Sequence, residues 1–106
     1  MPHPLLTQAD IEDYQRDGVV VVRGLWADQV DTLRAGVARN MSEPGPYAAE
    51  NLKDGEAGRF FDDYCNWQRI PEFEEVIRAS AVAEVAADLM RSDSAQLFHD
   101  HVLVKE

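Results

Sequence analysis

The chain has 106 residues, which is enough for one domain, 1–106, and for no second one. Apolar residues make up 45% of it and charged residues 28%, a composition that is typical of globular proteins and argues against a disordered chain. Twenty acidic side chains against ten basic ones leave a net charge of −10, which argues against nucleic-acid phosphates and anionic membrane surfaces as partners.

No segment has the character of a membrane span or of a secretory signal. The longest aliphatic run, Val19 to Val22, is far shorter than the ~20 residues that cross a bilayer. No cationic stretch followed by an apolar run precedes Thr7, as a signal peptide would require. The single cysteine, Cys65, cannot form a disulfide within the chain. Together these features predict a cytoplasmic protein.

The first predicted element is a helix that begins after Thr7. Thr7 is a good capping residue, and Asp10 stands where a capping-box partner would return the hydrogen bond. Leu6 can pack on Ile11 across the start of this helix, which is the usual hydrophobic staple. Gly18 suits the left-handed residue that ends a helix.

A strand and a second helix are expected next. The β-branched run Val19–Val22 predicts a strand that is buried on both faces. Apolar side chains at three- and four-residue spacing predict a helix over 27–41. Pro44-Gly45-Pro46 breaks the chain, and 47–58 has no clear period and reads as a long loop.

The second half predicts a strand, two helices and a last strand. The aromatic-rich stretch 59–67 predicts the strand. Pro71 suits the first position of one helix, and Ser80 is expected to cap the next, which Ser92–Ser94 ends. Residues 96–106 alternate as a strand does. This pattern of elements predicts an α+β fold.

The last strand is expected to have two different faces and an unpaired edge. His99, His101 and Leu103 point to one side, and Asp100 and Val102 point to the other. No turn residue follows Lys105 to bring in a further strand, so the small sheet cannot cover its own edges. We therefore expect the chain to be an incomplete part of a larger fold.

The only cluster with metal-ligand character is His99-Asp100-His101. The two imidazoles share a face and could hold one divalent ion if a third ligand came from elsewhere. The reading we favour is a polar pair that lines a cavity or bonds within the sheet. No acidic residue lies two positions after any histidine, so the ligand set of a non-haem iron oxygenase is absent. The sequence predicts no metal ligand within this chain.

The remaining polar and aromatic candidates carry no catalytic signal. Cys65 has no histidine near it in sequence and reads as a small packing residue. Asp62-Asp63 and Glu74-Glu75 read as solvated surface charges. Trp26 and Trp67 read as core or interface anchors. No catalytic residue is assigned.

Two ends of the chain resemble a known family. The opening has Leu6-Thr7, Tyr14, Asp17 to Val21 and Arg23-Gly24, followed by an amphipathic helix. This order resembles the N-terminal region of phytanoyl-CoA dioxygenase-like proteins. The closing stretch, 96–106, resembles the strand that leads towards the iron-binding segment in that family.

The resemblance implies an iron(II)- and 2-oxoglutarate-dependent oxygenase that hydroxylates a small organic substrate. The fold implied is a double-stranded β-helix, or jelly roll, of which this chain would supply the helical support and the first strands. The family's iron ligands follow the segment that matches Lys105, so the chain alone is expected to be inactive and to bind no cofactor tightly. The residue four before that lysine, His101, is the one position expected beside the 2-oxoglutarate.

Two other functions stay open. An acidic, non-catalytic interaction module could pair with a partner, or with a second copy, through the exposed C-terminal strand. A metal protein could use His99 and His101 across a dimer interface.

Overall fold

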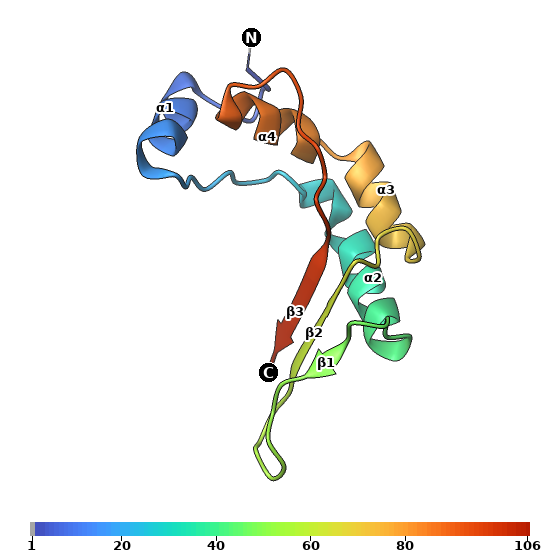
Figure 1. The fold of residues 1–106 in the computed structure, drawn as a ribbon. Coiled ribbons are helices and arrows are strands. Elements are labelled where there is room, and N and C mark those ends of the chain that lie inside the picture. Colours follow the sequence, from blue (N-terminus) through green and yellow to red (C-terminus); the bar gives the residue numbers. More distant parts are fainter. Residues whose placement is uncertain (1) are drawn as a thin grey trace.

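The computed structural model describes residues 2–106 as an α+β chain with four α-helices, one 3₁₀ turn and a three-stranded antiparallel sheet in that range (Figure 1). The helices and the turn are α1 Gln8–Asp17, η1 Ala27–Gln29, α2 Val30–Ser42, α3 Pro71–Ala79 and α4 Val82–Met90. The strands are β1 Ala49–Glu50, β2 Phe60–Tyr64 and β3 His101–Lys105. Among the described residues, no helix is long and apolar enough to cross a membrane. The predicted α+β class is confirmed.

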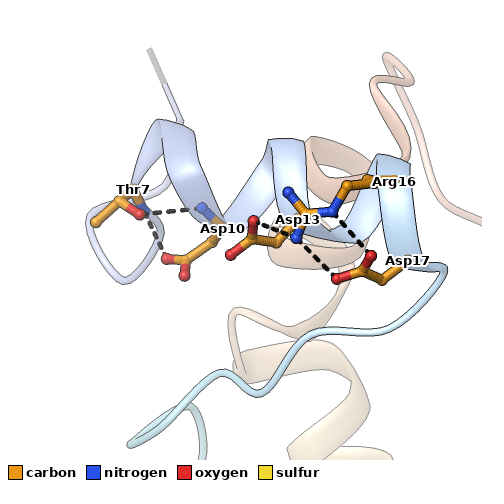
Figure 2. A network of polar contacts seen from close by, with 5 residues as sticks. All are labelled: Thr7, Asp10, Asp13, Arg16 and Asp17. Atoms are coloured by element: carbon orange, nitrogen blue, oxygen red, sulfur yellow. Dashed lines mark hydrogen bonds and ion pairs between the residues drawn. The ribbon is translucent and has the colours of Figure 1, made fainter.

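The first helix begins and ends where the sequence predicts. The Thr7 hydroxyl accepts a hydrogen bond from the Asp10 amide at 3.1 Å, and the Asp10 carboxylate accepts one from the Thr7 amide at 2.8 Å (Figure 2). Gly18 follows the helix with a φ of 76°, and its amide donates to the Tyr14 carbonyl at 2.7 Å. A residue with φ in this range is best supplied by glycine, which has no Cβ to clash.

α1 packs against α4 to form the first part of the core. Leu6 and Ile11 are each 6% exposed and lie in one cluster with Val85 of α4. Half-buried apolar side chains complete this cluster: Val22, Leu25, Ala81 and Leu89. The shared burial of Leu6 and Ile11 is consistent with the predicted hydrophobic staple between them.

The predicted strand over Val19–Val22 is wrong. These residues form an irregular connection between α1 and η1, and they pair with no strand in the part of the chain described. Val19 is 67% and Val21 70% exposed, so the run is not buried on both faces. β-Branched residues favour extended backbone, but a strand also needs a neighbour. Val22 packs instead on the cluster between α1 and α4, and this contact keeps the segment next to the two helices.

The second helix forms nearly as predicted, with η1 as its first turn and α2 as its body. α2 lies against α3, which has Pro71 at its first position as expected. The helices approach closely at Gly36, where an added Cβ would stand 2.6 Å from Cε1 of Phe73. An ion pair of 2.7 Å between Arg39 and Glu72 joins the same two helices at the surface.

The sheet has the order β1-β2-β3, with both pairs of strands antiparallel. β2 confirms the strand expected within 59–67, whereas β1 corrects the prediction that all of 47–58 is a loop. In the register of β2 with β3, Asp62 lies opposite Leu103 and Tyr64 opposite His101. β3 is an edge strand, because none of the residues described pairs with its other side.

The two faces of the sheet differ in what they contact. Phe61 and Asp63 lie opposite Val104 and Val102, and this inner face is turned to α2, whose Asn40 bonds to Asp63. The outer face carries the alternate residues of β2 and β3, among them the exposed Leu103. The predicted alternation of the last strand is therefore confirmed within His101–Lys105.

The ends of α4 and the start of β3 differ from the predictions. Ala81, and not Ser80, stands in the cap position of α4, although the Ser80 hydroxyl accepts from the Val82 amide at 3.4 Å. α4 ends at Met90 and is followed by Arg91, which adopts a φ of 54° as its cap, before the serines expected to stop the helix. The last strand covers only part of 96–106, because β2 offers no partner beyond Tyr64.

Candidate functional site

The outer face of the sheet gathers a group of exposed and half-buried ring side chains and one half-buried carboxylate. We call it the outer-face cluster, and it consists of Tyr47, Asp62, Tyr64, His99 and His101. The rings of Tyr47 and Tyr64 stack with centroids 4.7 Å apart and planes 12° apart. Tyr64 also lies 5.4 Å from His101 and 5.9 Å from His99, measured between ring centroids.

Strand register explains why these residues meet. Tyr64 and His101 occupy directly opposite positions on β2 and β3, so their side chains leave the sheet on the same side. His99 precedes β3 by two residues, and its ring centroid lies 6.2 Å from that of His101. The expectation that the two histidines share a face is confirmed.

Asp62 places a carboxylate next to one of these imidazoles. Its Oδ1 atom lies 3.7 Å from Nε2 of His101. Its other oxygen, Oδ2, accepts a hydrogen bond from the side-chain amide of Asn51. The side chains of His101 and Asp62 are 43% and 20% exposed, so solvent reaches the pair. The distance is that of an ion pair and is too long for a hydrogen bond between the two side chains.

Asp100 does not join the histidines, as the alternation of the strand predicted. Its carboxylate accepts hydrogen bonds from the backbone amides of Asn66 and Trp67, both at 2.9 Å. Its own carbonyl accepts from the Cys65 amide at 3.1 Å. Asp100 therefore fastens the loop after β2 to the residue just before β3. Across residues 2–106, no group of three histidine, cysteine, aspartate or glutamate side chains could hold a metal ion.

A buried polar network behind the sheet was missed by the sequence reading. Asp63 is 0% exposed, so the prediction that Asp62-Asp63 are solvated surface charges is wrong for this residue. Its carboxylate accepts from the Asn40 side-chain amide at 2.8 Å and from the Gly45 and Tyr64 backbone amides at 2.7 and 2.9 Å. The sequence contained a sign of this burial: Asp63 lies two residues after Phe61 in a strand, so both side chains are on the same face.

The hydrogen bonds to Asp63 decide its ionisation. Burial by itself raises the pKa of this carboxyl, but the hydrogen bonds from Gly45 and Asn40 and from other nearby donors outweigh burial. The pKa of Asp63 is therefore lowered, and the group is a structural carboxylate with no proton to exchange near neutral pH.

Cys65 lies on the surface and does not pack in the core. It is exposed, and its backbone has a φ of 62° at the turn that follows β2. The prediction of a small packing residue is therefore wrong.

An apolar groove lies beside β3 on the inner side of the sheet. It has a volume of about 460 Å³, and β3 alone supplies its sheet wall. Trp26 and side chains of α2 and α3 form the other walls: Leu33, Val37, Phe73, Val76 and Ile77. Trp26 is 41% exposed at this groove, in keeping with the expected interface anchor. The helix layer formed by α2 and α3 therefore extends beyond β3, past the edge of the sheet.

Comparison of the chain with protein-family models, curated proteins and solved structures finds no match.

Proposed function

We propose that this chain is the N-terminal part of a phytanoyl-CoA dioxygenase-like oxygenase that hydroxylates a small organic substrate in the cytoplasm. One observation carries the proposal. An antiparallel sheet has helices against one face, while its other face presents Tyr64, His99 and His101 to solvent. A double-stranded β-helix needs this arrangement at its start, because the outer face becomes the inner wall of the barrel.

The residues of this chain do not fit an iron ion. The oxygenase site needs two histidines and one carboxylate that bind the same iron ion at adjacent coordination positions. No such set of three side chains lies within residues 2–106. The oxidising chemistry would come from iron and 2-oxoglutarate bound by later residues. On this proposal the chain alone is inactive, and His101 contributes a hydrogen-bonding wall beside the 2-oxoglutarate.

A longer protein, expressed from DNA that continues beyond this chain, tests the proposal. Protein expressed from DNA that continues beyond the Glu106 codon should convert 2-oxoglutarate to succinate with iron(II), and the 106-residue chain should not. In the extended protein His101→Ala should raise KM for 2-oxoglutarate about tenfold, as expected for one lost hydrogen bond, with a smaller effect on kcat. His3→Ala is the matched control.

Two outcomes would remove this proposal. One is a stop codon directly after Glu106. The other is an extended protein that neither binds 2-oxoglutarate nor turns it over when iron(II) is supplied.

A second candidate function is self-association through the edge of β3. Arg59 and Glu106 exchange backbone hydrogen bonds, and the Cys65 amide donates to Asp100. Hydrogen-bonded pairs alternate along an antiparallel ladder, so Val102 and Val104 bond to β2. The N–H and C=O groups of the three alternate residues, His101, Leu103 and Lys105, therefore point to the open edge.

A second copy of β3 suits this edge. Antiparallel pairing centred on Leu103 places Val102 opposite Val104 of the other copy on the groove side. Leu103→Pro removes an edge N–H and leaves the bonds to β2, so it should abolish dimers in sedimentation velocity. Leu103→Val keeps that N–H and should keep the dimer. A monomer at all concentrations would dismiss this candidate.

A further inference from the structure

We propose that His99 and His101 form a surface site for a borderline divalent transition ion such as Zn²⁺ or Ni²⁺. This site needs no iron triad and does not depend on the proposed oxygenase activity. Only two protein nitrogens would bind the ion, and water would complete its coordination. The pair lies on the outer face, where both imidazoles reach solvent.

The spacing of the two rings suits a shared ion. Metal–nitrogen bonds of about 2.0–2.1 Å place each ring centre roughly 3 Å from the ion, so two ligating rings have centres at most roughly 6.5 Å apart. The centroids of His99 and His101 are 6.2 Å apart. This separation is within the limit, but a tetrahedral angle at the ion needs ring centres roughly 5 Å apart, so the two side chains must move roughly 1 Å closer to share it.

Asp62 supports one of the two ligands. Its Oδ1 atom lies 3.7 Å from Nε2 of His101, so a small movement of either side chain brings the carboxylate within hydrogen-bond reach of this ring. A carboxylate that accepts a hydrogen bond from one ring nitrogen fixes the imidazole tautomer and makes the other nitrogen a better ligand. The bond from Asn51 to the other Asp62 oxygen holds the carboxylate in place.

The ligand chemistry selects the class of ion. Imidazole nitrogens favour Zn²⁺, Ni²⁺ and Cu²⁺, whereas Mg²⁺ and Ca²⁺ prefer oxygen ligands. The net charge of −10 attracts any dication, so Mg²⁺ measures the contribution of charge alone. With two protein ligands, we expect micromolar affinity for Ni²⁺ and no comparable binding of Mg²⁺.

Binding should also order the segment before β3. His99 lies in an irregular stretch and His101 in the strand, so a shared ion links the two. An ion that binds the folded chain more tightly than the unfolded chain raises the midpoint of thermal unfolding. We therefore expect Ni²⁺ to raise this midpoint by more than Mg²⁺ does at the same concentration.

Isothermal titration of the 106-residue chain with Ni²⁺ tests the site. We expect one site per chain, and at least a tenfold loss of affinity in both His99→Ala and His101→Ala. His3→Ala is the matched control and should bind normally, because His3 lies beside α4, where its amide donates to Asp88. Asp62→Asn should weaken binding by about tenfold or more, since the carboxylate no longer supports His101.

Three results would overturn the proposal. The first is unchanged affinity in either the His99 or the His101 variant, with folding verified by circular dichroism. The second is equal binding of Mg²⁺, which would assign the effect to charge. The third is equal Ni²⁺ affinity in urea, which would assign it to the local sequence and not to the folded sheet.

Discussion

At the scale of single residues, neighbouring aspartates on β2 have opposite roles. Asp62 stands on the outer face beside His101, where solvent reaches it. Asp63 points inwards, is fully buried, and accepts hydrogen bonds from a helix, a loop and its own strand. One step along a strand reverses the side of the sheet, and this alone separates a surface charge from a structural one.

Replacing Asp63 should destabilise the fold strongly. Asp63→Ala leaves the buried side-chain amide of Asn40 and the part-buried backbone amide of Gly45 without an acceptor, and each unsatisfied buried donor costs about 1–3 kcal/mol. We expect the free energy of unfolding in urea to fall by roughly 2–4 kcal/mol. Asp54→Ala, at an exposed loop position, should change it little. Equal effects of the two substitutions would contradict the assigned role.

The same residue makes stability depend on acid. The pKa of Asp63 is lower in the folded chain than in the unfolded chain, so the folded form binds the proton less readily. The stabilisation is complete above the unfolded pKa, near 3.9, and is lost as pH falls through the folded pKa. Unfolding curves between about pH 5 and 2 should show this loss, and Asp63→Asn should reduce its slope.

At the scale of elements, the approach of α2 to α3 depends on one small residue. Gly36 faces the ring of Phe73, and an added Cβ would lie 2.6 and 2.8 Å from two of its carbons. Helices that cross this closely need a small side chain at the contact, since packed interiors have no spare space. Elsewhere in α2 the sequence satisfies ordinary helix preferences.

Gly36→Ala should therefore destabilise the chain although alanine is the better helix former. Overpacking costs about 1–3 kcal/mol, and the gain in helix propensity is about 1 kcal/mol. We expect a net loss of roughly 1 kcal/mol in thermal or urea unfolding. In a Phe73→Leu background the clash is relieved, so the same substitution should become neutral or stabilising. A loss of the same size in both backgrounds would argue against the contact.

At the scale of the whole molecule, the helix layer is wider than the sheet. The groove beside β3 exposes apolar side chains of α2 and α3 where no described strand covers them. Exposed apolar surface next to an open strand edge favours pairing with another chain. The net charge of −10 on each copy opposes that pairing through repulsion.

Self-association of the chain should therefore grow stronger with salt. Salt screens repulsion between the two acidic copies and leaves the apolar contact and the strand pairing intact. Sedimentation velocity at about 20 and 500 mM NaCl should show a larger dimer fraction at the higher concentration. Dimers that weaken with added salt would indicate that ion pairs hold them together.

The sequence by itself determined the elements whose signals are local. The capping box and terminal glycine of α1, the proline that opens α3 and the alternation of β3 each depend on residues within a few positions. The shared face of His99 and His101 followed in the same way from strand geometry. Neighbouring residues suffice in these cases, because caps and periodicity act over a single turn or strand.

Only the tertiary structure decided which strands found partners and which polar side chains were buried. The valine run 19–22 has strand-forming residues but pairs with no described strand; Val22 packs on the α1–α4 cluster, and the two-residue β1 takes the place beside β2. Asp63 became a buried carboxylate because α2 and the loop at Gly45 bring donors to it from 23 and 18 positions away. Strand alternation places Asp63 on the same face as Phe61, but the donors that meet it there depend on how distant segments pack, which no local pattern encodes.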